Sequence, residues 1–512
     1  GVLALWQFHF DAADEALSAA LFDAIAAGHD RIAADAAARL LYVKGVQSPD
    51  EAKRDLRLAA ALVDKLRGAP EIEATYFNNL GVIYDLSGDI DEARAASERA
   101  LELKRRIYGE RHYEAGYSLS NLAMLDVTEG YHERARDRFV AAAAIFEETF
   151  GPDHPQTAAL LSNLGNAYAH TGQWTRAAET YAAMAAIFAG SPASWSEMGP
   201  YILPDRGYFR LTLHHFDDAA ADFREALRLL GDPPPADAPP VIQARVGLAA
   251  VAAARERWDE VDRRLAELAT AMSADDPVAP FAVANAFDLR AQRRLLSADA
   301  ARERPDQENT STEKGENPEG PARARSPERP VTPETLENPE DSDSPEDDAL
   351  ALADHTRAFE IRAAKSPPGS PLRAHAHLEL ARALLRFDRL PEVEEHLAEA
   401  RTIIDAELPS TSPERPALER LTAALELAKG DPEAATASLR RAVQLLDGAR
   451  EPDDFDLALA TFDLARALRR RDPTDPDARP LAERARSTLA GLGPGWRAEI
   501  ARIDGWLAAT SP

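Results

Sequence analysis

The sequence predicts an all-α protein, a right-handed superhelical solenoid of about ten helical hairpins with one disordered acidic insertion. Three observations predict this fold class. The chain has 512 residues, more than one hydrophobic core can serve, since cores stop growing at roughly 250–300 residues. A sequence pattern recurs at a fixed step, as in repeat arrays. Alanine dominates the hydrophobic residues and aromatic residues make up only 7%, which favours many small helix–helix contacts over one bulky core.

The repeated unit is 42 residues long. Asn79, Asn121 and Asn163 follow one another at this step, and each is followed by Leu and then by a small residue. The other positions that keep this register are Gly88, Gly130 and Gly172, Ala93, Ala135 and Ala177, Gly109 and Gly151, and His112 and His154. Since many independent positions share one register, the repeat is a true internal repeat. We interpret the two periodic histidines as structural elements of the repeat.

Each unit predicts two amphipathic helices. Leu80, Gly81 and Tyr84 fall on one face of a first helix. Gly88 ends it, because glycine readily adopts the left-handed conformation on which many helices close. Asp91 and the glutamate after it begin a second helix, where acidic side chains suit the positive helix N-terminus. Ala93 and Ala100 mark the points where the two helices cross closely, because only a small side chain fits there.

These residues resemble the tetratricopeptide repeat, in which Leu-Gly, an aromatic residue and two small residues stand at fixed steps. The matching positions are Phe77, Leu80, Gly81, Tyr84, Ala93 and Ala100 in one unit and Leu161, Leu164, Gly165, Tyr168, Ala177 and Tyr181 in another. The step of 42 residues exceeds the usual ~34, and the surplus lies at the end of the second helix and in the loop. In this respect the unit resembles the kinesin-light-chain type, which implies a peptide-binding solenoid. The clear resemblance covers residues 71–190.

Degenerate hairpins of the same kind are predicted on both sides of the clear repeats. We expect them over residues 1–70, 191–301 and 349–490, followed by a capping helix and tail over residues 491–512. Aromatic–acid or proline-containing turns mark the starts of their second helices, at Pro49, Phe216, Trp258, Phe387 and Gly430.

One segment breaks the helical pattern. Residues 302–348 contain almost no apolar side chains and are dense in Pro, Glu, Ser and Asp, so they are predicted to be disordered. We interpret the segment as an insertion within one hairpin, between its two helices. The alternative is a tether between two separate solenoids. Ser326, Thr332 and Ser344 each precede a proline and are candidate phosphorylation sites, but solvated filler is the favoured interpretation of the segment.

Composition narrows the classes of partner. The formal net charge of −28 disfavours nucleic acid and anionic membranes, because both require clustered Lys and Arg. No window approaches the ~18 apolar residues of a membrane span. Without cysteine, and with histidine pairs that lack the i,i+4 spacing of helical ligands, the chain predicts no metal site and no cofactor. The chain begins with Gly1 rather than Met, so we expect a fragment of a longer protein. We expect the chain to be cytoplasmic, or to be part of a larger protein that is anchored in a membrane.

The candidate binding site lies on the first helices. The resemblance implies that the polar positions before each Leu-small pair face a concave groove. The candidate peptide-binding residues are Asn78, Asn79, Tyr117, Asn121, Asn163, Asn166 and His170. Asparagine disfavours helix interiors, so its recurrence needs a reason: the amides either bind an extended peptide backbone or tie one hairpin to the next. Residues 75–86, 117–128 and 159–170 contain no Lys or Arg, which argues against a clamp for a peptide carboxylate.

No catalytic signature is present, neither a phosphate-binding loop nor a nucleophile elbow nor a zinc-protease motif. We therefore predict a non-enzymatic scaffold that binds a peptide or protein segment in its groove. The alternative is the sensory or substrate-docking region of a larger bacterial serine/threonine kinase, because the chain is similar to the C-terminal repeat regions of myxobacterial-type kinases. A third alternative, the effector half of a transcription regulator, gains no support from the acidic charge. The sequence does not reveal the oligomeric state.

Overall fold

The computed structural model describes residues 10–47, 49–66, 68–275, 277–303, 344–447 and 455–510. All regular structure in these ranges is helical, and no strand occurs among them. None of the described helices is both long and apolar enough to cross a membrane. The predicted fold class, an all-α right-handed solenoid of helical hairpins, is confirmed.

Within the described ranges, ten antiparallel hairpins follow one another along the chain. They are α3 (Asp30–Gln47) with α4 (Pro49–Lys65), α5 (Pro70–Leu86) with α6 (Ile90–Tyr108), α7 (Tyr113–Glu129) with α8 (His132–Phe150), α9 (Pro155–His170) with α10 (Trp174–Ala189), α11 (Pro192–Thr212) with α12 (Phe216–Leu229), α13 (Pro239–Ala254) with α14 (Trp258–Ala266), α16 (Pro280–Glu303) with α17 (Ser344–Ala364), α18 (Pro371–Arg386) with α19 (Leu390–Glu407), α20 (Glu414–Ala428) with α21 (Pro432–Asp447), and α22 (Phe455–Arg471) with α23 (Ala478–Gly491). Helix α2 (Phe10–Ala27) covers α3 at one end. The short helices are α15 (Ala269–Ser273) and the 3₁₀ turn η2 (Pro494–Trp496), and α24 (Arg497–Ala509) caps the other end.

The 42-residue register extends beyond the segment in which sequence motifs reveal it. Gly172 has a positive φ of 70° at the turn between α9 and α10. His214 (φ 59°) and Glu256 (φ 57°) occupy the same turn position 42 and 84 residues later. Non-glycine residues in this conformation cost roughly 1–2 kcal/mol each, which the packed hairpins around them must offset. The degenerate hairpins therefore keep the repeat geometry although they have lost its glycine.

The periodic histidines cap first helices. The Nδ1 atoms of His112 and His154 accept hydrogen bonds from the backbone N–H groups of Glu114 (3.3 Å) and Gln156 (3.2 Å). Each ring also stacks on the aromatic residue that ends the preceding second helix, with the His154 and Phe150 ring centres 5.0 Å apart. The structural interpretation of these histidines is thus confirmed.

Close approach of helices depends on glycine at the crossing points. Phe223 of α12 is fully buried and lies between Gly207 of α11 and Gly247 of α13. A Cβ atom at Gly207 would lie 2.7 Å from the Phe223 ring, and one at Gly247 would lie 2.3 Å from it. Any side chain at either position would therefore displace the ring that joins three helices.

Helices α16 and α17 pack on each other although about forty residues separate them in the chain. Arg290 of α16 forms two bonds with the Asp354 carboxylate (2.5 and 2.9 Å), and Arg362 of α17 reaches Asp288 at 2.6 Å. Ala358 and Ile361 of α17 continue the hydrophobic core of α13–α16. The stack is therefore continuous across this hairpin. Residues 304–343, including Ser326 and Thr332, lie outside the described residues, so the predictions of disorder and phosphorylation there remain predictions. Ser344 is the first residue of α17.

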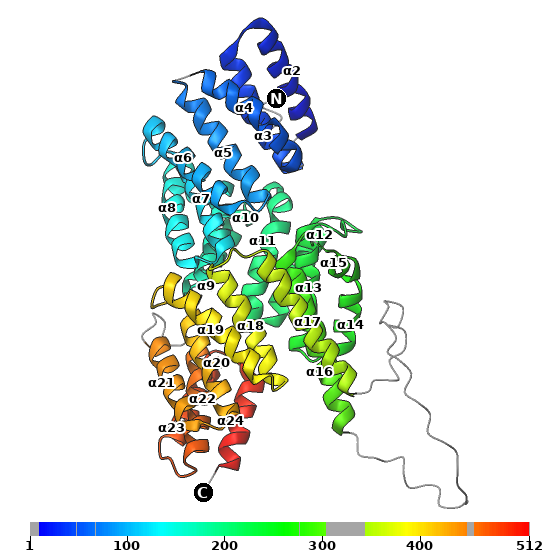
Figure 1. Cartoon of the computed structure of the whole chain (residues 1–512), viewed down its shortest axis with the longest axis vertical. Coiled ribbons are helices and arrows are strands. Elements are labelled where there is room, and N and C mark those ends of the chain that lie inside the picture. The colour runs from blue at the N-terminus through cyan, green and yellow to red at the C-terminus, as the bar shows by residue number, and fades with distance from the viewer. Residues whose placement is uncertain are drawn as a thin grey trace, which may run out of the picture.

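Successive turns of the superhelix contact each other. Figure 1 shows the C-terminal hairpins, coloured yellow to red, beneath and beside the hairpins around α9. We use the name inter-turn seam for the contacts between residues 130–216 and residues 371–496. Two of these contacts are the hydrogen bond from Tyr131 Oη to Glu407 Oε2 (3.0 Å) and the stack of His214 on Trp496, with ring centres 3.9 Å apart.

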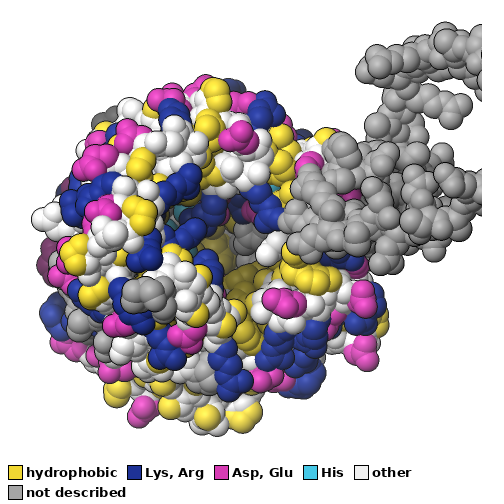
Figure 2. Space-filling model, turned by 90° about the horizontal axis from the view of Figure 1, so that it is seen from below, with side chains coloured by type: hydrophobic (Ala, Val, Ile, Leu, Met, Phe, Trp, Pro, Cys, Tyr) yellow, Lys and Arg dark blue, Asp and Glu magenta, His cyan; other side chains and the backbone are white. Residues whose placement is uncertain are grey.

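Seen along its longest axis, the molecule encloses a hollow (Figure 2). Lys and Arg side chains gather along its wall with hydrophobic ones, although the whole chain is acidic. First helices of the later hairpins carry arginines, unlike the three cation-free stretches of α5, α7 and α9. Several of these arginines are already paired with acids. Arg206 and Arg210 both bind Asp222 (2.6 and 2.7 Å), and Arg420 binds Asp463 at 2.9 Å.

Candidate functional site

The two asparagines of the first clear repeat are engaged within the protein. Asn79 is only 7% exposed, and its Nδ2 donates to the main-chain oxygen of Ala38 in α3 at 2.9 Å. The Asn78 amide oxygen accepts from Lys104 Nζ at 2.8 Å. These amides tie α5 to the preceding hairpin and to α6. In this repeat the asparagines therefore connect neighbouring helices of the protein itself.

The corresponding amides of the next two repeats have no partner. Asn121 on α7 and Asn163 on α9 are half-buried, as is Asn166 one turn further along α9. None of the three has a hydrogen-bond partner among the described residues. Their donors and acceptors are therefore available to a ligand that reaches this face.

Tyr117 links the first helices of these two repeats. Its hydroxyl donates to Gln156 Oε1 of α9 at 3.1 Å, and its ring packs edge-on against Phe146, with ring centres 4.9 Å apart. Burial raises the pKa of the phenol, followed by the nearby Glu114 carboxylate. The side chain fixes the spacing of α7 and α9 and leaves the ring half-exposed beside the asparagines.

His170 ends the same face of α9 and reaches the inter-turn seam. Its ring stacks on His132, with ring centres 4.3 Å apart and planes 9° from parallel. The surrounding protein crowds His170 and lowers its pKa to about 4, with His375 as the second cause, and burial lowers the pKa of His132 as well. Both rings are therefore neutral at neutral pH. His170 nevertheless remains accessible, because it lines a cavity.

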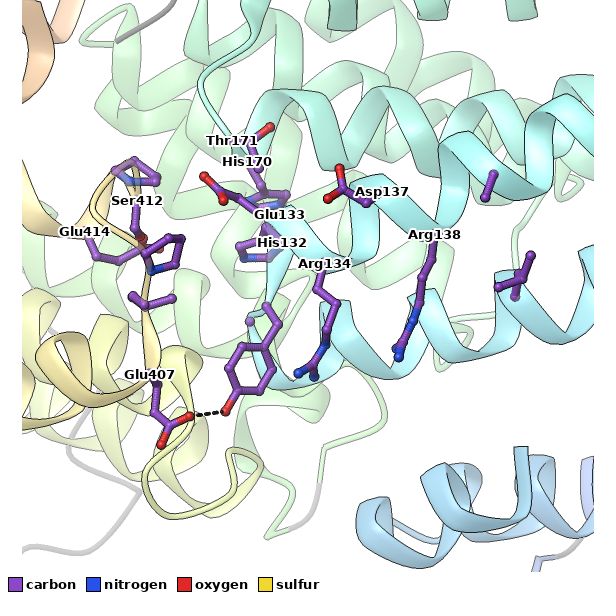
Figure 3. Close-up of a pocket in the computed structure, with 17 residues that line it drawn as sticks. His132, Glu133, Arg134, Asp137, Arg138, His170, Thr171, Glu407, Ser412 and Glu414 are labelled. Carbon is purple, nitrogen blue, oxygen red and sulfur yellow. Dashed lines mark hydrogen bonds between the residues drawn. The ribbon is translucent and has the colours of Figure 1, made fainter. Parts of the chain in front are cut away.

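This cavity has a volume of about 560 Å³ and lies between the two turns of the superhelix. One wall consists of the turn before α8, the start of α8 and the end of α9, and the other is the α19–α20 connection around Leu408 and Ser412 (Figure 3). Thr411 Oγ1 donates to Glu133 Oε1 at 2.6 Å and, with the Tyr131–Glu407 bond, joins the walls. We call it the seam cavity. It contains His170 but none of the candidate asparagines.

A buried carboxylate holds the arginines of one cavity wall. Asp126 of α7 is fully buried and binds three guanidinium groups, those of Arg94 (2.9 Å), Arg134 (2.7 Å) and Arg138 (2.5 Å). Arg94 also pairs with Glu129. Arg134 lies over the Tyr131 ring, 4.1 Å from its centre. The two arginines that line the cavity, Arg134 and Arg138, are therefore both paired with a buried carboxylate.

A second pair of neutral histidines lies between α18 and α19. The Nδ1 atoms of His377 and His396 are 2.8 Å apart, so one ring donates and the other accepts. Burial lowers the pKa of His377 to about 4 and also lowers that of His396. No group of three or more potential metal ligands occurs among the described residues.

Acid should destabilise this pair. Because the folded pKa of His377 lies below the unfolded value of about 6.5, the folded state binds fewer protons, and its stabilisation is lost as the pH falls from about 6.5 toward 4. We predict that the double variant His377→Leu/His396→Leu loses less thermal stability than the wild type between about pH 7.5 and about pH 5. Circular dichroism melts at the two pH values test this, and equal losses in both proteins would contradict it.

The fold places the chain among α-solenoid repeat proteins, and one family model matches part of the chain. The tetratricopeptide repeat family model matches residues 71–139 and 115–188. This class of repeat is a non-catalytic fold that typically mediates binding to proteins and peptides. A search of curated proteins found no match to this sequence.

Three of the solved structures that match this chain have low sequence identity to it and TM-scores below 0.5. The human IFIT1 dimer with m7Gppp-AAAA is 13% identical, with a TM-score of 0.46, and the match covers 93% of this chain and 90% of that one. BtubC (BKLC) from P. vanneervenii is 17% identical with a TM-score of 0.28, covering 60% of this chain and 99% of that one. A putative kinesin light chain with nearly identical TPR-like repeats from Podospora anserina is 16% identical with a TM-score of 0.29, covering 49% and 95%.

Proposed function

We propose that this chain is a non-enzymatic scaffold that binds an extended peptide segment of a partner protein along the inner face of α7 and α9. The observation that carries the proposal is the contrast among three equivalent asparagines. The Asn79 amide binds a main-chain oxygen of the protein itself, at Ala38. Asn121 and Asn163 stand at the same register without a hydrogen-bond partner in the part of the chain that the structure describes. They offer the same bond to the backbone of a ligand, and such bonds tolerate many peptide sequences.

Charge supports a peptide over a nucleic acid. The net charge of −28 opposes the approach of a phosphate backbone. Arg206 and Arg210 of the first helix α11 are bound to Asp222, and α7 and α9 carry no Lys or Arg along the asparagine face. The relationship to bacterial kinases remains a prediction, because nothing in the fold or the comparisons supports it.

The test begins with peptides selected from a displayed random library against the immobilised wild-type protein. The double variant Asn121→Ala/Asn163→Ala should bind the selected peptides roughly tenfold more weakly or worse, since each lost hydrogen bond is worth about 0.5–1.5 kcal/mol. Isothermal titration calorimetry measures the affinities, and unchanged affinity would contradict the proposal.

Asn79→Ala provides the matched control. Its amide is buried and tied to Ala38, so its loss should lower the melting temperature, with a cost of about 1–3 kcal/mol. Peptide affinity should remain that of the wild type, because no ligand can reach this amide. If this variant lost affinity as the double variant does, the effect would be one of stability and not of contact.

A further inference from the structure

The seam cavity has the chemistry of a site for a cation. Four acidic side chains line it, and three of them, Glu133, Glu407 and Glu414, form no ion pair among the described residues. Each accepts a hydrogen bond from a neutral hydroxyl instead, from Thr411, Tyr131 and Ser412 respectively. The two lining arginines, Arg134 and Arg138, bind Asp126 and form no ion pair with these three carboxylates among the described residues.

A buried nitrogen adds a second observation. The Nδ1 atom of His132 is buried in the cavity wall and has no hydrogen-bond partner among the residues that the structure describes. Since the His132 ring is kept neutral, one of its nitrogens is an acceptor. Figure 3 shows His132 and His170 among the labelled acidic side chains of the wall. In the tautomer with the proton on Nε2, Nδ1 is this acceptor, and an N–H donor that reaches it from the cavity would satisfy it.

The apolar part of the wall indicates what kind of cation fits. Leu119, Ala141, Leu408 and Pro409 line the cavity together with the carboxylates. Lysine and arginine combine an aliphatic stem with a charged end, so they can cover apolar surface and reach carboxylates at once. A cavity of about 560 Å³ is also large enough for such a side chain together with its backbone.

The cavity continues the proposed peptide face. Asn163, Asn166 and His170 follow at steps of three and four residues on α9, so they lie on one side of the helix. A peptide held by the two asparagines and extended along α9 would arrive at His170, which lines the cavity.

We infer that the seam cavity receives a lysine or arginine side chain of the bound peptide, so that the scaffold recognises a basic residue at one fixed position. The inference rests on the proposed function. The cation contacts both turns of the superhelix, because Glu133 belongs to α8 and Glu414 to α20. Binding therefore also strengthens the inter-turn seam.

The experiment uses the full chain and the peptides selected above. The enriched peptides should share an Arg or Lys at one position, and its replacement by citrulline, a neutral analogue of arginine, should weaken binding at least about tenfold. In the variant Glu133→Gln/Glu414→Gln, the basic and citrulline peptides should bind within about twofold of each other. Added salt should weaken only the basic peptide.

A control variant removes the same charge elsewhere. Glu98→Gln/Glu147→Gln changes two exposed glutamates on the second helices α6 and α8, and it should keep the full discrimination between the two peptides. Enriched peptides without a shared basic residue, or equal discrimination in both glutamate variants, would overturn the inference alone, provided the asparagine variant still loses affinity. If no peptide is selected, both the proposed function and this inference fail.

Discussion

Replacing Asp126 by alanine should cause the largest loss of stability of any single substitution in the central repeats. The carboxylate is fully buried and binds Arg94, Arg134 and Arg138. Removing it leaves three guanidinium groups converging on a site with only Glu129 to balance them. Breaking a buried ion pair by removing one partner costs about 3–5 kcal/mol, because the remaining charge stays buried and unpaired.

Urea unfolding followed by circular dichroism measures the total loss, and native-state hydrogen exchange of α7 and α8 locates it. The matched control is Asp137→Asn on α8, whose carboxylate is 69% exposed and pairs only with its neighbour Arg136. It should change the stability by less than about 0.5 kcal/mol. Similar losses in the two variants would show that the Asp126 cluster does not hold these repeats together.

Trp496→Ala should open the superhelix. The side chain is 4% exposed and stacks on His214 and on Phe455, whose ring also contacts Trp174 of α10. These rings connect the last hairpin to hairpins more than 200 residues away in the chain. Truncating a buried Trp to Ala typically lowers the free energy of unfolding by about 3–5 kcal/mol. Here many of the lost contacts belong to the inter-turn seam. Small-angle X-ray scattering should therefore show a larger radius of gyration for the variant.

Trp506→Ala is the control for this effect. Trp506 lies in the capping helix α24 and packs edge-on against Phe462, with ring centres 5.8 Å apart, and both residues belong to the C-terminal end. Its loss should lower the melting temperature without changing the radius of gyration. If Trp496→Ala left the radius of gyration unchanged, the seam would not determine the shape of the molecule.

The hairpins of the clear repeats were predictable because each repeat carries a glycine at its own turn. Gly88, Gly130 and Gly172 mark hairpin turns, and the structure confirms them. The continuation of the register was missed, because His214 and Glu256 adopt the same conformation without glycine. A signal was available, since Phe216 and Trp258 follow Trp174 at steps of 42 residues.

The candidate site was predictable only in part, because its remaining features depend on neighbours distant in sequence. Nothing near Asn79 distinguishes it from Asn121, and only the packing of α3 against α5 shows that its amide is occupied. The seam cavity joins Tyr131 to Glu407 across 276 positions, so no local pattern could indicate it. For the same reason the sequence predicted His170 as a groove residue but could not indicate that its ring stacks on His132.

The most direct test of the central claim, that α7 and α9 hold the peptide, is hydrogen–deuterium exchange with a selected peptide bound. Amide exchange should slow in residues 117–128 and 159–170 and remain unchanged in the second helices, residues 90–108 and 132–150, apart from the start of α8 beside the seam cavity. Protection confined to the second helices would place the peptide on the outer face and contradict the account.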